Sequence, residues 1–184
     1  GAIALALLAG VLSLVGIVAG PPAAEAAAPM PVGLVSAGGS TSCGVTAAGG
    51  ALCWGNDSQG QAAGSNVDDT VPQQVFQLTT GVTAVSAAST HSCAIVSDAA
   101  KCWGGNSSGE LGSGSFSASG GIPIQVSGLT SGVTAISSGS AHTCAVVSGA
   151  AKCWGRQDGR LGNGLSVGSS NVPVQVTGLT AGVT

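Results

Sequence analysis

The 184-residue sequence contains no tyrosine, only two phenylalanines and only one methionine. Charged residues make up 6% of the chain, and its only cations are Lys101, Lys152, Arg156 and Arg160. Binding to the phosphate backbone of nucleic acids needs a clustered basic face, which four cations cannot build. So little charge also argues against a solvated disordered tail or a coiled coil. We therefore expect a folded chain that binds no nucleic acid.

Motifs of catalysis are missing as well. The chain has no Gly-x-Ser-x-Gly elbow, no His-Glu-x-x-His pair and no phosphate-binding loop that ends in lysine. His91-Ser92 and His142-Thr143 are sequence neighbours, so on a strand their side chains point to opposite faces and form no nucleophile–base pair. Asx turns explain the loops "NDSQG" and "QDGR", with calcium binding as the weaker alternative. We expect no enzyme, no cofactor and no metal.

The N-terminus differs from the rest of the chain. Residues 2–20 carry no charge, and Ala24 and Ala26 are the small residues that a cleavage site after Ala26 requires. We interpret residues 1–26 as a secretory signal peptide that lacks its basic start, followed by a linker at 27–31. A membrane anchor is the alternative, because about 18 apolar residues can span a bilayer. Both hypotheses place the remainder outside the cytoplasm, secreted or at the cell surface, with membrane contact only through this segment.

An internal repeat covers the remainder of the chain. "AAKCWG" occurs twice and "ALCWG" once, so that Trp54, Trp103 and Trp154 lie 49 and 51 residues apart. Each copy also ends on a related tail, "VPQQVFQLTTG", "IPIQVSGLTSG" or "VPVQVTGLTAG". Aligned from a shared valine, the copies occupy residues 32–81, 82–132 and 133–182, and a fourth begins at 183–184.

Short strands and tight turns are expected within each copy, because 32 glycines accompany many small and β-branched residues. No copy has helical periodicity. Four strands in about 50 residues match a propeller blade. We therefore predict an all-β chain, a partial propeller of about three four-stranded antiparallel blades, preceded by a signal or anchor helix. In the second copy the strands are predicted at residues 82–86, 92–96, 99–104 and 122–126.

The cysteines flank predicted hairpins. In "CAVVSGAAKC", counting outward from a Ser148-Gly149 turn places Cys144 opposite Cys153 at a non-hydrogen-bonded site, where Cα atoms lie about 4.5 Å apart. The second copy gives the same count, and an extra turn residue, with Gly49 in the left-handed position, keeps the first copy in register. Each bridge should contribute about 2–3 kcal/mol. We predict the disulfides Cys43–Cys53, Cys93–Cys102 and Cys144–Cys153.

Two other roles for the cysteines stay open. They are buried free thiols, or metal ligands in which His91 joins Cys93 and Cys102 on one face of the hairpin. Zinc sites usually show closely spaced cysteine pairs, and none occurs in the chain. An exported chain favours the disulfide interpretation.

The stretches "HSCAIVSDAAKCWGGNSSGELGSG" and "HTCAVVSGAAKCWGRQDGRLGNG" resemble the repeat of the regulator of chromosome condensation family. The shared signature is a histidine near the first hairpin strand, a turn, Trp-Gly and then Gly-x-Leu-Gly. The resemblance covers residues 32–184 and implies a seven-bladed propeller, of which three copies are less than half. The first copy departs from it, with Thr41 in place of the histidine and "GQAAG" in place of "GELG".

The residues after the second cysteine of each hairpin are expected to pack the blades. The tryptophan points to the opposite face from the cysteine, and the next glycine allows close backbone approach. Ligand stacking by the tryptophans is the weaker alternative, because regular recurrence is what packing predicts. The histidines are expected to hydrogen-bond within their blades. These packing positions are Trp54, Trp103, Trp154, Gly55, Gly104, Gly155, His91 and His142.

Function is therefore expected at the surface. The favoured hypothesis is a secreted, non-catalytic scaffold whose propeller loops bind a protein or glycan partner. The family name implies guanine-nucleotide exchange as an alternative, but that activity uses loops outside the repeat signature. A secreted enzyme inhibitor, distantly similar to the β-lactamase-inhibitor propeller, is a further alternative, although such a face should carry aromatic anchors.

A three-copy piece should not be stable alone. Each blade buries its faces against its neighbours, so terminal blades without neighbours expose apolar faces and strand edges. We expect a full-length product of about seven copies, and we expect this piece to self-associate when it is expressed by itself.

Overall fold

A computed structural model describes residues 34–184 of the protein. The predicted signal peptide or anchor at residues 1–26, its helix and the linker at 27–31 lie outside the described residues. In the described part of the chain all the regular elements are β-strands. No helix there has the length and apolar character needed to cross a membrane. The prediction of an all-β fold is confirmed.

The twelve strands form three separate sheets, and each sheet is an antiparallel meander of four strands. The first blade contains β1 (Val35–Ala37), β2 (Thr41–Val45), β3 (Ala51–Gly55) and β4 (Asp69–Gln74). The second blade contains β5 (Val82–Ala87), β6 (His91–Val96), β7 (Ala99–Gly104) and β8 (Ile124–Gln125). The third blade contains β9 (Val133–Ser138), β10 (His142–Val147), β11 (Ala150–Arg156) and β12 (Ser169–Gln175).

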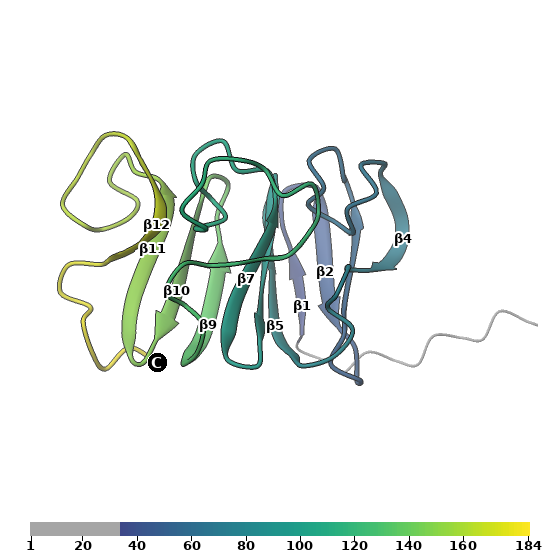
Figure 1. Cartoon of the computed structure of the whole chain (residues 1–184), viewed down its shortest axis with the longest axis horizontal. Helices are drawn as coiled ribbons and strands as arrows, with labels where there is room; N and C mark the ends of the chain where they lie inside the picture. Colours follow the sequence, from purple (N-terminus) through teal and green to yellow (C-terminus); the bar gives the residue numbers. More distant parts are fainter. Residues whose placement is uncertain (1–33) are drawn as a thin grey trace, which may run out of the picture.

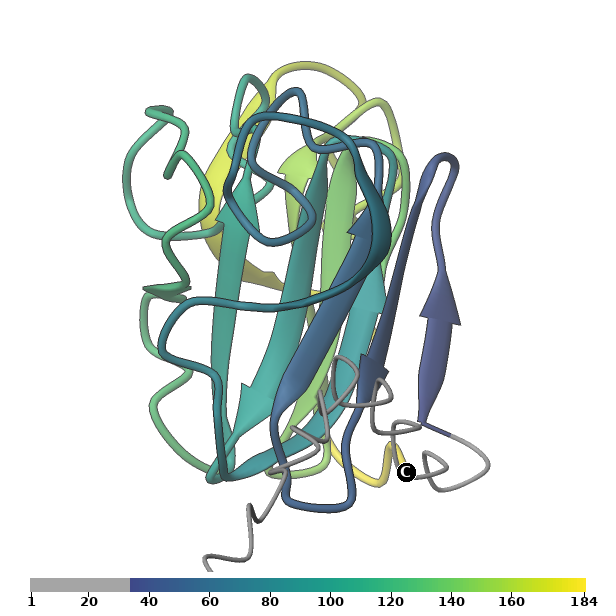
Figure 2. The ribbon, with the colours of Figure 1, turned by 90° about the vertical axis from the view of Figure 1, so that its right-hand side faces the viewer.

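The blades stand side by side along the molecule, as the prediction of a partial propeller requires (Figure 1). The long loops β3–β4, β7–β8 and β11–β12 leave the blades at the upper end of that view, and the hairpin turns lie at the lower end. Figure 2 views the molecule from the first blade and shows loops arching over the same end. Residues of three repeats are thereby gathered on one face of the molecule.

The outer strand of each blade is its least regular strand. In the second blade it shrinks from the predicted 122–126 to Ile124–Gln125, and its ladder begins directly after Pro123. Proline has no N–H to donate, so it is tolerated at the start or edge of a sheet but does not extend the ladder. In the other two blades a register shift in the third strand precedes the pairing with the outer strand. The three inner strands match the prediction closely.

The hydrophobic core lies between the blades. One cluster joins the first blade to the second and contains Val45, Val75 and Leu78 against Ala94 and Trp103. The other joins the second blade to the third through an equivalent set of residues. Because each sheet is one layer thick, a blade buries its side chains only against the next blade.

A glutamine in the outer strand closes each blade. The side-chain nitrogen of Gln125 lies 2.9, 3.1 and 2.9 Å from the carbonyl oxygens of Ala100, Val126 and Leu129. Gln74 and Gln175 make the same three contacts in the other blades. The glutamine thus binds the outer strand and the turn that follows it to the third strand, which explains why the repeat tail retains this residue.

Candidate protein-interaction site

Three disulfides cross the hairpins of the blades. The bonded pairs are Cys43–Cys53, Cys93–Cys102 and Cys144–Cys153, with Cα separations of 4.1, 4.0 and 4.0 Å. The cysteines face one another in the register counted from the turns. In the first blade the loop at residues 46–50 holds the extra residue, with Gly49 at φ 78°. An insertion in the turn therefore leaves the cysteine register intact.

Each blade presents two different faces to its neighbours. We call the side that carries the disulfide the disulfide face, and the side that carries the tryptophan the tryptophan face. The disulfide face of the second blade contacts the third blade, because Cys93 Sγ lies 3.8 Å from Thr143 Oγ1. The tryptophan face of the second blade contacts the first blade through Trp103. Every joint between blades is therefore asymmetric.

The tryptophans of the second and third blades bond to the preceding blade. Trp103 Nε1 donates to the carbonyl oxygens of Gln61 and Ala62, at 3.0 and 2.9 Å. Trp154 Nε1 donates to the Glu110 carbonyl at 2.7 Å. Both indoles are fully buried, whereas Trp54 in the first blade is only half-buried. The tryptophan thus anchors its blade beneath a loop of the blade before it.

The glycine after each tryptophan lies against the neighbouring turn. Gly104 has φ 102°, and a Cβ added there would be 2.7 Å from the Thr90 carbonyl oxygen. Gly55 and Gly155 have φ 104° and equally close contacts. No side chain fits at these positions, since both the conformation and the space exclude a Cβ. This accounts for the Trp-Gly pair in all three copies.

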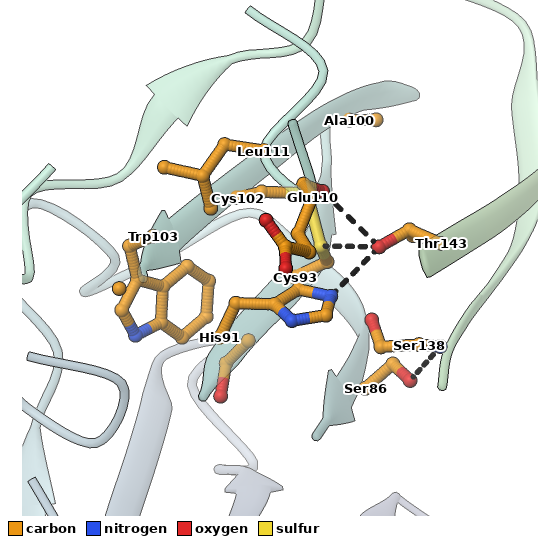
Figure 3. The surroundings of a disulfide bond; sticks show 12 residues. Ser86, His91, Cys93, Ala100, Cys102, Trp103, Glu110, Leu111, Ser138 and Thr143 are labelled. Carbon is orange, nitrogen blue, oxygen red and sulfur yellow. Dashed lines mark hydrogen bonds between the residues drawn. A yellow bond between two sulfur atoms is a disulfide. The ribbon is translucent and has the colours of Figure 1, made fainter. Parts of the chain in front are cut away.

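His91 joins the second blade to the third. Its Nε2 lies 2.8 Å from Thr143 Oγ1 (Figure 3), and the imidazole is fully buried. Burial lowers the pKa of His91 to about 4, and nearby His142 lowers it further. A neutral ring with its proton on Nε2 donates to Thr143, whose hydroxyl then donates to the Glu110 carbonyl at 3.2 Å. The expectation of a hydrogen bond within the same blade is wrong for His91.

Serine side chains complete the joints. Ser36 Oγ accepts a hydrogen bond from the Ala87 amide at 3.0 Å, and Ser86 Oγ accepts one from the Ser138 amide at 2.8 Å. Ser92 Oγ donates to the Gln61 carbonyl at 2.8 Å. A serine hydroxyl therefore accepts a strand amide of the next blade in both joints. The sequence alone did not indicate these bonds, because the partners lie 31 to 52 residues apart.

The long loops at the upper end are held by buried polar side chains. Asp57 accepts hydrogen bonds from the Ala62 amide at 2.7 Å and the Asn66 amide at 3.0 Å. Asn106 accepts from the Leu111 amide and donates to two further loop carbonyls. Since the Asp57 oxygens bind the loop itself, the Asx interpretation holds for "NDSQG". Among residues 34–184 no three or more His, Cys, Asp or Glu side chains are arranged to hold a metal ion.

The loops also meet one another across the joints. A Cβ on Gly60 would be 2.5 Å from the Gly121 nitrogen, so the first and second loops touch backbone to backbone. A Cβ on Gly109 would be 2.7 Å from the Asn171 Cα, which places the second loop against the third blade. These contacts, with the polar anchors, hold the three loops as one continuous surface.

Apolar side chains lie exposed on this surface. We call the group Val67, Phe116, Leu165 and Val167 the apolar loop row. Their exposed fractions are 71%, 52%, 56% and 80%. Each belongs to a β3–β4, β7–β8 or β11–β12 loop, and each follows a glycine at φ 86° that the three loops share. The sequence signal for it is an apolar residue among Gly, Ser and Asn, where a solvated loop has no need of one.

The repeat signature agrees with known family models. A model of the regulator of chromosome condensation (RCC1) repeat matches residues 102–146, and a second model of that repeat matches residues 34–61. The chain belongs to the RCC1 repeat family. No curated protein sequence gives a significant match.

Solved structures share the fold of these RCC1 repeats. Prp20p from Saccharomyces cerevisiae aligns with a TM-score of 0.66 at 18% identity over 78% of the chain, and human WBSCR16 aligns with the same score at 22% identity over 78%. Yeast RCC1 (Prp20) bound to Kap60 also gives 0.66, at 16% identity over 81%. The chain spans 37% of the length of the first two structures and 40% of the third.

The RCC1 signature of this chain therefore describes joints between blades. The tryptophan and histidine bond across joints, and the second glycine of Gly-x-Leu-Gly does too: a Cβ on Gly112 would be 2.7 Å from Trp154 Nε1. The first blade departs from the signature where Ala63 replaces that glycine. The apolar loop row lies outside the signature, so a partner specific to this chain would contact residues that the family pattern leaves free.

Proposed function

We propose that the protein is a non-catalytic interaction scaffold, secreted or held at the cell surface, that binds a protein partner through the apolar loop row. The observation that carries the proposal is the exposure of Val67, Phe116, Leu165 and Val167 on one end of three blades. Exposed apolar side chains that gather on one face mark interaction sites more often than scattered ones do.

Rigidity of the loops supports the proposal. Asp57 and Asn106 anchor two loops through buried hydrogen bonds, and glycine contacts join neighbouring loops. A surface that is already ordered loses little conformational entropy on binding. Apolar side chains without flat aromatic platforms fit a protein surface better than a glycan.

The solved relatives support a protein as partner. Prp20p was described together with its binding to Gsp1p and histones, and yeast RCC1 was solved bound to Kap60. An exported location is supported by the apolar, uncharged residues 2–20 and by six cysteines that all lie in disulfides. N-terminal sequencing of the exported protein tests it: a start at Ala27 agrees with a cleaved signal, and a chain found only in the cytoplasm contradicts it.

Two phenylalanines provide a matched test of the binding surface. Phe116 belongs to the apolar loop row with 52% of its side chain exposed, and Phe76 follows β4 at the hairpin end with 55% exposed. Each is replaced in turn by the photo-crosslinking residue benzoylphenylalanine in the full chain. We expect a discrete protein adduct from position 116 and none from position 76.

Serine variants then measure the energetics with the captured protein. Phe116→Ser and Leu165→Ser should each weaken binding about tenfold or more, as loss of an apolar anchor does. Phe76→Ser should leave the affinity unchanged. Identical adducts from both positions, or full affinity in the Phe116→Ser, Leu165→Ser double variant, would show that the loop row is not the binding surface.

A further inference from the structure

Two blade faces of the described chain lie against no other blade. One is the disulfide face of the third blade, where a shallow hollow is lined by Ala135, Ile136, Ser137, Cys144 and Val146. The other is the tryptophan face of the first blade, which carries the half-buried Trp54. The equivalent faces inside the molecule are completely covered, with Cys93, Cys102 and Trp103 all at 0% exposure.

The open face of the third blade has the acceptors of a joint. In the inner joints a serine hydroxyl accepts a strand amide of the next blade, and a loop carbonyl accepts its indole N–H. Ser137 stands at the position of Ser36 and Ser86, and it is exposed. The Arg160 carbonyl stands at the position of the Gln61 and Glu110 carbonyls, directly after the loop glycine.

The open face of the first blade has the matching donors. Ser42 and Trp54 occupy the positions of Ser92 and Trp103 in the second blade, where both side chains bond to the preceding blade. The tryptophan face also carries Leu52 at the position where the other blades have a lysine. Replacing a cation by leucine makes this face more apolar than its inner counterparts, as suits a face that is covered.

We propose that the tryptophan face of the first blade docks on the disulfide face of the third blade in a second copy of this chain. The two faces are complementary halves of a joint that the molecule already forms twice. The contact is heterologous, because different surfaces meet, so chains join head to tail. In the joint Trp54 Nε1 donates to the Arg160 carbonyl of the second copy, and the Ala37 amide donates to its Ser137 hydroxyl.

Positions for a site-specific cross-link follow from the inner joint. A Cβ on Gly39 would be 2.6 Å from Ser89 Oγ, so the same position of successive blades meets across a joint. The third blade has Ser140 at this position, and both Gly39 and Ser140 are exposed. Gly39 does not have a positive φ, so cysteine fits its backbone. In the proposed assembly position 140 of one copy faces position 39 of the next.

The experiment mixes two variants of the 184-residue chain, Gly39→Cys and Ser140→Cys, under oxidising conditions. We expect a disulfide-linked dimer on non-reducing gels, with the 39–140 linkage identified by mass spectrometry. Ser107→Cys, an exposed loop position away from both faces, replaces Ser140→Cys as the matched control and should give no dimer above background. Association through the apolar N-terminal segment alone would give equal yields in both mixtures and would overturn the proposal.

Blocking variants add a second readout. Adding Ser137→Arg to the Ser140→Cys chain places a bulky cation in the joint, and adding Trp54→Ala to the Gly39→Cys chain removes the anchor. Each should abolish the 39–140 cross-link, while circular dichroism shows that the blades remain folded. A cross-link of unchanged yield in both folded variants contradicts the head-to-tail joint.

Discussion

The second and third blades carry nearly the same hairpin, but its side chains have different surroundings. His91 is fully buried and bonded to Thr143, whereas His142 is only half-buried and its Nδ1 has no hydrogen-bond partner within the described residues. Cys93 and Cys102 are at 0% exposure, whereas Cys144 is half-buried. Only the second blade has a following blade against its disulfide face. The environment of the signature residues is therefore set by the neighbouring blade and not by the hairpin itself.

The tryptophans give the largest expected contrast. Trp103→Ala should destabilise the protein by about 3–5 kcal/mol, because a buried indole and its two hydrogen bonds to the first blade are lost. Trp54→Ala, at a half-buried position of the same sequence motif, should cost only about 1 kcal/mol. Urea unfolding with the disulfides intact measures both. Equal losses would mean that the tryptophans act within their own blades.

The pH dependence of stability is the second contrast. Folded His91 has a pKa of about 4, below the ordinary 6.5, so its contribution is fully present above pH 6.5 and is lost as the pH falls toward 4. Across that window the unfolded chain binds the proton and the folded chain does not, which costs about 3 kcal/mol. Below the folded pKa both states are protonated and the loss stops.

Asparagine variants isolate this effect from the carboxylates. The stability difference between wild type and His91→Asn should shrink as the pH is lowered from about 6.5 to about 4.5. His142→Asn should show a weaker dependence, because burial, and then Arg160, lowers the pKa of a ring that is only half-buried. Parallel pH profiles for wild type and His91→Asn would exclude a neutral buried imidazole.

The disulfides should break in an order set by the same comparison. The bridges Cys93–Cys102 and Cys144–Cys153 each have a sequence separation of 9, so the chain-entropy contribution of about 2–3 kcal/mol is the same for both. Access differs, because the third blade leaves Cys144 partly exposed. Graded reduction followed by alkylation and mass spectrometry should label Cys144 and Cys153 first. If the three bridges are labelled together, reduction follows global unfolding instead of access.

Counting residues within one blade was enough to predict its hairpins. The turn at Ser148-Gly149 fixes the register back to Cys144 and Cys153, and a one-residue slip would move every side chain to the other face. The bond from His91 to Thr143 was beyond such counting, because it spans 52 residues and depends on how two sheets pack. Loop positions such as Phe116 were also missed as a surface, since their grouping depends on the stacking of blades. Local pattern therefore determined the blades, and packing determined the joints.

The smallest expected effect concerns the joint hydroxyl. Thr143→Val keeps the shape of the side chain but removes the acceptor of the His91 Nε2 proton, which leaves a buried donor without a partner. We expect a loss of about 1–2 kcal/mol, because Trp154 still occupies the Glu110 carbonyl and the apolar contacts remain. The matched variant Thr41→Val, in the first blade, breaks a hydrogen bond to the Asn56 carbonyl and reports on a hydroxyl that bonds within its blade. Adding His91→Asn tests the coupling: if the imidazole and hydroxyl act as one unit, His91→Asn should cost less in the Thr143→Val background than in the wild type but cost the same in the Thr41→Val background. Strict additivity in both backgrounds would mean that His91 and Thr143 stabilise the joint independently, by packing alone.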